Sequence, residues 1–315
     1  MLSIKQLPTN QSSDDAKQEQ EEQQQKLFKV VLTTIQHFFG SFPDWLKGVD
    51  DPRTGDIKYP IEAMLFAGIW TFLCQVESRR QIGLKLRNGL SRINFQTLFG
   101  IKSFPHGDTL NDLYSELEPE QVQDIICNLI EILIRKKVLY AYRFFDQYYT
   151  IAIDGTGIVT YHKRHCQHCL KRKTRKGETL YYHNVLEAKL ITANGFCFSI
   201  MTEFIENENE KQTKQDCELK AFYRLADRLN NRFPRLPIVL LMDGLFAGGT
   251  TFSICAENGW HFIIVLKDGD LPLVNAEFRK IVQTNLCDYL SIRTSEKISI
   301  FQEFVWANSI RHHLE

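Results

Sequence analysis

The sequence has no excess of either charge: 38 Lys and Arg residues balance 38 Asp and Glu residues, so the formal net charge is zero. Non-specific binding to nucleic acid requires positive charge that faces phosphate. The total charge therefore gives no indication of such a function. Any binding of nucleic acid has to come from a local basic patch, and the distribution of charge matters more than its sum.

The sequence also lacks a secretory signal and a long apolar run. Residues 1–26 are rich in Gln, Glu and Ser, and we expect a disordered tail because they have little apolar surface to bury. The longest apolar stretch, Ala63 to Cys74, has about a dozen residues, whereas a bilayer span needs roughly 20. These absences predict a cytoplasmic protein with no membrane association and with its eight cysteines mostly reduced.

The chain is long enough for two domains, because it has 315 residues, of which 43% are hydrophobic and 12% aromatic. Apolar residues recur at helical spacing from Leu27 to Phe38 and again from Val122 to Leu133. Between these segments, Pro60 is placed to open a helix and Ser78 to cap another. We therefore expect residues 27–147 to form a helical domain that binds DNA or dimerises.

The pattern changes near residue 148, where short β-rich runs begin. Asn194-Gly195 is a strong hairpin signal between two of these runs. The predicted elements are strands at 149–155, 181–191 and 196–204, a helix at 216–229, a strand at 237–244, a helix at 250–257 and a strand at 261–266. Three antiparallel strands followed by alternating helix and strand is the order of a ribonuclease-H-like sheet. By analogy, residues 148–315 are expected to form an α/β domain with a mixed sheet and flanking helices.

Two acidic residues end apolar strands and are each followed by glycine: Asp154 and Asp243. Open α/β sheets place their sites at such strand ends, and an aspartate there is costly unless it is solvated or bound to a cation. Two carboxylates on neighbouring strands suit Mg²⁺ ions that clamp a phosphodiester. The alternative is that each Asp-Gly pair only makes a turn. Glu203 ranks lower as a site residue, and the helix dipole alone explains Asp216 and Glu218.

The local basic patch is the segment 162–176, which contains no acidic residue. It follows the Asp154 strand, so it is expected to hold DNA phosphates beside the carboxylates. The alternative is a solvated loop. Its basic residues are Lys163, Arg164, Lys171, Arg172, Lys173, Arg175 and Lys176.

The same segment contains a Cys-x₂-Cys pair, Cys166 and Cys169, with His162, His165 and His168 alongside and His183 on the next predicted strand. Structural Zn²⁺ takes four nitrogen or sulfur ligands in a tetrahedron. One such pair supplies two of them, and histidines, His183 among them, could supply the rest. The alternative is a pair of ordinary thiols, since zinc sites usually contain two such pairs.

Several blocks of the sequence resemble insertion-sequence transposases with a DDE catalytic domain, from about residue 40 onward. The blocks are Asp51-Pro52-Arg53 with Tyr59-Pro60, Ile153-Asp154-Gly155-Thr156, Cys166-Gln167-His168-Cys169-Leu170 with Tyr181-Tyr182-His183, Lys214-Gln215-Asp216-Cys217-Glu218, Met242-Asp243-Gly244-Leu245-Phe246, and Phe262-Ile263-Ile264-Val265-Leu266-Lys267. The last two blocks, in order with Asp154, are the most specific.

The resemblance implies that Asp154 and Asp243 are the first two catalytic acids, which bind Mg²⁺ or Mn²⁺. It also implies cleavage and strand transfer at the ends of a mobile DNA element, with double-stranded DNA as partner and a homodimer when the chain is intact. The third acid of the family is a glutamate on a helix far downstream. Glu296 and Glu303 lie in strand-like surroundings and do not fit it, so we expect a truncated copy whose catalytic domain is incomplete at its C-terminal end, with weakened metal binding and strand transfer.

Two other functions stay open. One is a non-catalytic remnant that binds DNA or a partner, and the other is a different ribonuclease-H-like nuclease such as a junction resolvase. The helical N-terminal part and the Cys/His insert argue against the resolvase. Candidate phosphate contacts in the helical part, with a solvated helix face as the alternative, are Arg79, Arg80, Lys85 and Arg87.

Overall fold

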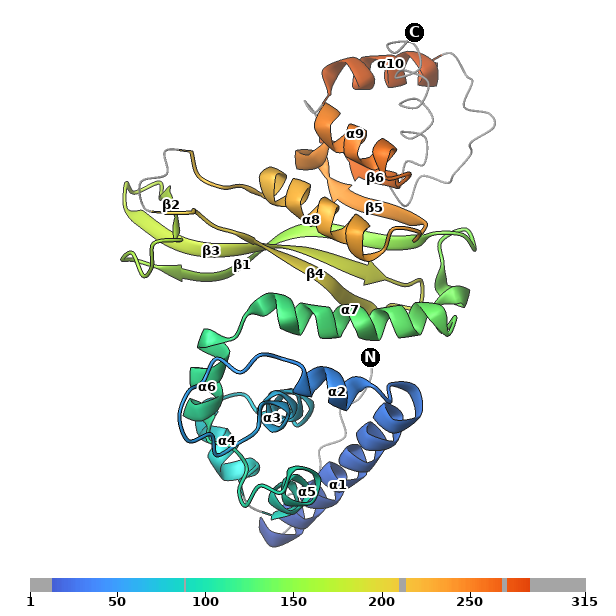
Figure 1. Ribbon diagram of the computed structural model, residues 1–315. Coiled ribbons are helices and arrows are strands. Elements are labelled where there is room, and N and C mark those ends of the chain that lie inside the picture. The colour runs from blue at the N-terminus through green and yellow to red at the C-terminus, as the bar shows by residue number, and fades with distance from the viewer. Residues whose placement is uncertain (1–12, 88, 210–213, 268–270, 284–315) are drawn as a thin grey trace. The chain divides into compact units, whose positions relative to one another are not determined.

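The computed structural model describes residues 13–87, 89–209, 214–267 and 271–283 (Figure 1). The chain divides into two compact units, Met1–Ile132 and Leu133–Glu315. The division falls inside the helix Pro119–Arg135, earlier in the chain than the boundary expected after residue 147. No helix among the described residues combines the length and the apolar character needed to cross a bilayer.

Unit 1 is helical, as expected. Its helices are α1 (Ser13–Phe38), α2 (Phe42–Lys47), α3 (Ile61–Leu73), α4 (Arg79–Lys85), α5 (Gly89–Phe99), α6 (Gly107–Glu116) and α7 (Pro119–Arg135), which crosses the division. Pro60 immediately precedes α3, and the Ser78 side chain accepts a hydrogen bond from the Gln81 N–H at the start of α4. Both helix starts therefore lie where the sequence predicts them.

The N-terminal tail differs from the expectation. Helix α1 begins at Ser13, so residues 13–26 are helical rather than disordered, while residues 1–12 lie outside the described part. Gln, Glu and Lys favour helices where they need not be buried. The helix is also held by contacts distant in sequence: Ser91 donates to Gln24 and Asn94 donates to Gln25.

The core of unit 1 surrounds α3, which is apolar on nearly all sides. Ala63, Met64 and Trp70 are fully buried, and the Phe28 ring meets the Trp70 ring edge-on at 5.0 Å between centroids. The Trp70 indole N–H donates to the Ser91 hydroxyl at 3.2 Å, so the buried nitrogen has a partner. A helix that is hydrophobic all round tends to be buried, and most of α3 is, whereas Ile69, Phe72 and Leu73 near its C-terminal end are exposed.

Unit 2 contains a mixed, open sheet of six strands. They are β1 (Tyr149–Tyr161), β2 (Leu170–Lys173), β3 (Thr179–Ile191), β4 (Cys197–Ile205), β5 (Ile238–Asp243) and β6 (His261–Val265). The order along the sheet is β2-β3-β1-β5-β6, and β4 also pairs with β3. Strand β3 is antiparallel to β1, β2 and β4, whereas β1, β5 and β6 run parallel.

Helix α8 (Glu218–Arg232) packs on strands β3 and β4 of this sheet (Figure 1). Its buried residues, Ala221, Phe222, Leu225 and Leu229, recur at the spacing of one helical face. Helices α9 (Gly249–Glu257) and α10 (Pro272–Gln283) and the short turns η1 (Tyr140–Tyr142) and η2 (Gly244–Phe246) complete the unit.

The predicted elements of unit 2 are present, but β1 and β3 are longer than expected, and β5 and β6 are slightly shorter. The β3–β4 hairpin turns at Asn194-Gly195, where Gly195 has φ +87°, a conformation that glycine adopts without strain. Strand β2 was not predicted, because Lys171, Arg172 and Lys173 are all exposed and give no apolar pattern. It forms because it pairs with residues 179–182 of β3.

Candidate active site and metal centre

The parallel pairing of β1 and β5 brings the two predicted aspartates to the same level of the sheet. The register runs from Tyr149 opposite Ile238 to Ala152 opposite Leu241. Continued by two residues at the same offset, it sets Asp154 opposite Asp243. Paired positions in neighbouring strands direct their side chains to the same face. Both residues are exposed, so two carboxylates 89 positions apart in the sequence meet at one point of the sheet.

The alternative that an Asp-Gly pair only makes a turn holds for Asp243 and fails for Asp154. Asp243 Oδ1 accepts a hydrogen bond from the Leu245 N–H at 2.9 Å and caps η2, so this residue does shape a turn. Strand β1, however, continues from Asp154 to Tyr161, with a bulge in its pairing between Gly157 and Val159. No turn follows Asp154, so turn formation does not explain an exposed acid at that position.

A third carboxylate lies beside this pair, that of Glu218, for which the sequence predicts only a structural role. Glu218, in the first turn of α8, lies directly against Gly155, so that a methyl group added at Gly155 would overlap the Glu218 carboxylate. Burial raises the pKa of Glu218, and the negative charges of Asp154 and Asp243 raise it further. Glycine at position 155 is therefore what allows the Glu218 side chain to approach the two aspartates.

The three carboxylates do not form a tight cage. Within the described residues, Cys166, Cys169 and His183 are the group whose ligand atoms all lie within 4.8 Å of one another, so the carboxylate oxygens of Asp154, Asp243 and Glu218 do not all lie that close together.

Glu187 is a fourth acid near the site, and the sequence analysis missed it. It stands opposite Asp154 in the β1–β3 register. Its oxygens accept hydrogen bonds from the hydroxyls of Ser199, at 2.9 Å, and Thr202, at 2.7 Å. These bonds stabilise a carboxylate whose cross-strand neighbour has the same charge. Its position, which alternates with apolar residues of the strand-like run 181–191, was a sequence signal that could have indicated it.

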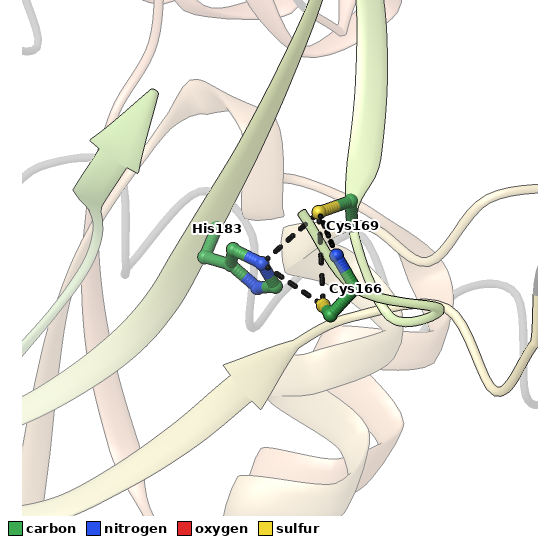
Figure 2. A group of neighbouring side chains, drawn as sticks. All are labelled: Cys166, Cys169 and His183. Atoms are coloured by element: carbon green, nitrogen blue, oxygen red, sulfur yellow. Dashed lines mark hydrogen bonds between the residues drawn. The ribbon is translucent and has the colours of Figure 1, made fainter. Parts of the chain in front are cut away.

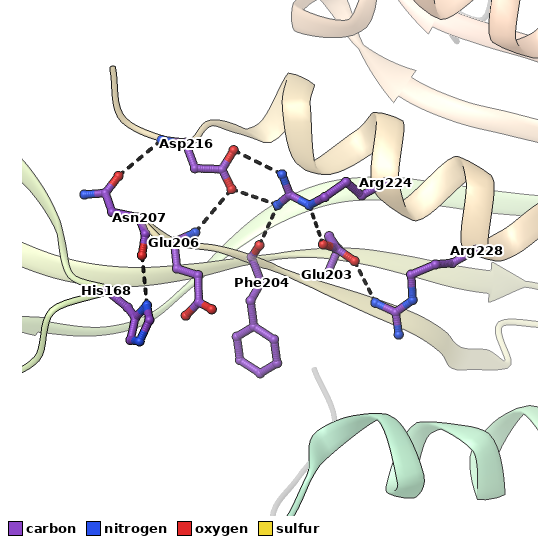
Figure 3. A network of polar contacts seen from close by, with 8 residues as sticks. All are labelled: His168, Glu203, Phe204, Glu206, Asn207, Asp216, Arg224 and Arg228. Atoms are coloured by element: carbon purple, nitrogen blue, oxygen red, sulfur yellow. Dashed lines mark hydrogen bonds and ion pairs between the residues drawn. The ribbon is translucent and has the colours of Figure 1, made fainter. Parts of the chain in front are cut away.

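Glu203, the low-ranked candidate, is committed elsewhere (Figure 3). Its side chain is 11% exposed, and its two oxygens accept from Arg224 and Arg228 of α8, each at 2.6 Å. Arg224 also bonds Asp216 at 2.7 Å, so Asp216 takes part in an ion pair rather than acting through the helix dipole alone. This ion-pair network attaches α8 to β4, so Glu203 does not contribute to the carboxylate site.

The predicted cysteine–histidine group is brought together (Figure 2). The Sγ atoms of Cys166 and Cys169 are 3.6 Å apart, and His183 Nε2 lies 3.4 Å from the first and 3.3 Å from the second. The Cys166 N–H points at Cys169 Sγ at 3.4 Å. Burial opposes ionisation of the Cys169 thiol, but the backbone N–H groups of Cys166 and His165 outweigh it and lower the pKa of this thiol.

The other histidines of the segment have different partners. The Nδ1–H of His168 donates to the Asn207 carbonyl at 2.9 Å, and the His165 ring stacks on Tyr161 with centroids 4.7 Å apart. Within the described part of the chain, the group that can hold a metal does not include His162, His165 or His168.

The basic residues of 162–176 form an exposed surface on and around β2. Two of the arginines lie over aromatic rings, Arg164 above Tyr181 and Arg172 above Tyr182, each 5.3 Å from the centroid. Basic groups interleaved with aromatic rings suit a phosphate backbone and unstacked bases. The segment is partly a paired strand, so the solvated-loop alternative does not describe residues 170–173.

The candidate phosphate contacts in unit 1 are less uniform. Arg79 lies 3.7 Å from Asp108, and Arg87 donates to the Phe104 carbonyl at 3.3 Å, so these two have structural partners. Arg80 and Lys85 are exposed on α4. The downstream acids Glu296 and Glu303 lie outside the described residues.

Comparison of the chain with protein-family models and with curated proteins finds no match.

Proposed function

We propose that the chain is a DNA transposase of the DDE class, with a ribonuclease-H-like catalytic unit that cleaves and joins phosphodiesters with the help of Mg²⁺ or Mn²⁺. The observation that carries the proposal is the convergence of Asp154, Asp243 and Glu218 from three separate elements, β1, β5 and α8. The sheet order, with a three-stranded antiparallel part beside parallel β1, β5 and β6, supports the fold assignment.

The residues present fit divalent cations. Burial raises the pKa of Glu218, and the negative charges of Asp154 and Asp243 raise it further, so the ionised Glu218 carboxylate is repelled by both aspartates. A bound cation relieves this repulsion, and hard cations prefer carboxylate oxygens. When bound, such ions activate the attacking oxygen and stabilise the leaving oxygen of a phosphodiester.

The roles of the chain's own groups follow from their positions. Asp154 and Asp243 would hold the cations from the sheet, and Glu218 would hold them from the start of α8. Lys171, Arg172 and Lys173 on β2 bind the DNA backbone and keep it beside the carboxylates. Glu218 thus takes the place of the third acid that the resemblance set far downstream, and a catalytic set is available among the described residues.

The rival function is a non-catalytic DNA-binding remnant, which the wide spacing of the carboxylates favours. A nicking assay on supercoiled plasmid DNA with Mg²⁺ or Mn²⁺, run beside a gel shift on a labelled duplex, separates the two. We expect nicking by the wild type. We expect Asp154→Asn and Glu218→Gln to lower the nicking rate more than about 100-fold, beyond the roughly 10–100-fold cost of an outer-shell change, without weakening DNA binding.

The matched control is Asp227→Asn, which removes an exposed acid of α8 on the surface away from the sheet and should nick at the wild-type rate. Tight DNA binding by a wild-type chain that does not nick with either metal would establish the remnant. Undiminished nicking by Asp154→Asn would reject the assignment of the site. Preference for four-way junctions over linear duplexes would point to a resolvase.

A further inference from the structure

The Cys166–Cys169–His183 group has the dimensions of a zinc site. Zn–S bonds of about 2.3 Å and Zn–N bonds of about 2.0–2.1 Å in a tetrahedron separate two sulfurs by about 3.8 Å, and a sulfur from a nitrogen by about 3.5 Å. The corresponding distances here are 3.6 Å between sulfurs, and 3.4 and 3.3 Å from sulfur to nitrogen. Three atoms from a loop and a strand thus occupy three corners of one tetrahedron (Figure 2).

The loop is shaped to keep that arrangement. The Cys166 N–H donates to Cys169 Sγ, which stabilises sulfur as an acceptor and fixes the Cys-x₂-Cys turn. Cys169 is fully buried and Cys166 and His183 are half-buried, so an ion would be shielded from bulk water but reachable. Two thiolates neutralise a divalent ion, so the basic surface around the group would keep its charge.

The loop is connected to the start of α8 through Asn207, which is 4% exposed (Figure 3). The Asn207 backbone N–H donates to the His168 carbonyl, and its own carbonyl accepts from His168 Nδ1. Its side-chain nitrogen donates to the Cys169 carbonyl at 3.0 Å, and its side-chain oxygen accepts from the Asp216 N–H at 3.3 Å. All four polar groups of one residue therefore join the cysteine loop to the residue two before Glu218.

A second connection comes from Gln215. Its side-chain amide accepts from the Lys171 N–H at 2.6 Å and donates to the Lys171 carbonyl at 2.9 Å. The amide thereby pairs with β2 as the backbone of a further strand would. Lys171 lies two residues after Cys169, and Gln215 lies three residues before Glu218. The segment 214–217 is attached on one side to the cysteine loop and basic strand, and on the other to the carboxylate site.

We propose that Cys166, Cys169 and His183 bind Zn²⁺, with a solvent molecule in the fourth position, and that this ion fixes the basic segment and, through Asn207 and Gln215, the first turn of α8 that carries Glu218. Binding of zinc is independent of the proposed phosphodiester chemistry. Only the consequence for cleavage, that Glu218 is held in place, rests on the proposed function.

The metal is tested first, on the full chain purified under reducing conditions. We expect about one Zn²⁺ per chain by elemental analysis, and Co²⁺ added to the metal-free chain should give the strong visible bands and thiolate charge-transfer band of a tetrahedral thiolate site. Cys166→Ser and Cys169→Ser should lose both. The control Cys197→Ser removes an exposed cysteine of β4 and should keep both.

His183→Cys guards against loss of folding, because it keeps a third ligand: Co²⁺ should still bind, with a stronger charge-transfer band from three thiolates. A wild-type chain that takes up neither ion overturns the proposal. The proposal is also overturned if the reduced chain contains no metal and the chain kept under non-reducing conditions shows, by mass, a Cys166–Cys169 disulfide.

The positioning role has its own readout, hydrogen exchange. Removal of zinc should increase exchange in residues 164–173 and in the first turn of α8, and Asn207→Ala should increase it in that turn while zinc stays bound. Unchanged exchange at the start of α8 in both cases rejects the positioning role. Because neither measurement uses DNA, a failure here is distinguishable from a failure of the transposase assignment.

Discussion

At the scale of single residues, position 155 and position 218 depend on each other. Any side chain at 155 would occupy the place of the Glu218 carboxylate. The Glu218 pKa is raised, so its folded-state pKa lies above its unfolded value. Between these two values the native state binds more protons than the unfolded state, and native stability falls as pH rises through that window. Above the window, the ionised Glu218 destabilises the metal-free protein.

We therefore predict that Glu218→Gln raises the melting temperature of the metal-free protein at pH 7 by about 1–4 °C. The gain should disappear as the pH falls below about 4.3, the ordinary carboxyl value, where Glu218 is protonated in both states. Thermal unfolding followed by circular dichroism across pH measures this. Mg²⁺ should then stabilise the wild type more than the variant. A lower melting temperature for the variant at pH 7 would contradict the prediction.

At the scale of elements, the attachment of α8 to the sheet depends on charge as well as on its apolar face. Glu203 accepts from two arginines of α8, and one of them also holds Asp216. The arginine side chains are 44% and 32% exposed, so solvent screens their charges, and Glu203 at 11% is the buried partner. Removing the charge of Glu203 should cost more than removing either arginine.

We predict that Glu203→Gln lowers the free energy of unfolding by about 1–3 kcal/mol, the range for hydrogen bonds to charged groups. Urea denaturation measures it. Arg228→Ala should cost less, and the double variant should cost less than the sum of the two, because the residues are in direct contact. Asp227→Asn, an exposed change on the same helix, should stay within about 0.5 kcal/mol of wild type. Additive costs would show that the two side chains do not interact in solution.

At the scale of the whole molecule, a net charge of zero conceals an uneven distribution. The segment 162–176 has seven basic residues and no acid, while three carboxylates lie near one another at Asp154 within β1, at Asp243 at the end of β5 and at Glu218 at the start of α8. Affinity for DNA should then come from the basic surface, with the acids kept for cations. Affinity that comes from phosphate contacts falls with salt in proportion to their number.

We predict that the triple variant Lys171→Ala, Arg172→Ala, Lys173→Ala weakens binding to a random duplex and reduces the slope of log K against log salt by about 2–3, at about 0.9 per lost contact. Fluorescence anisotropy at several salt concentrations gives the slope. The charge-matched control, Lys26→Ala, Lys29→Ala and Lys47→Ala, changes exposed residues of α1 and α2 and should leave the slope unchanged. Equal slopes for both variants would remove β2 from the DNA-binding surface.

Elements whose signals are local could be predicted from the residues alone. Apolar runs ending in Asp-Gly indicate β1 and β5, Asn194-Gly195 indicates the hairpin, and Cys-x₂-Cys with His183 indicates the candidate metal ligands. Strand β2 and the helical start of the N-terminal segment could not be predicted in this way, because partners distant in the sequence stabilise them. The approach of Glu218 to Asp154 and Asp243, and the link that Asn207 makes between the cysteine loop and α8, are visible only in the folded chain. Those relations depend on strand register and on the missing side chain of Gly155, which no periodicity within one segment records.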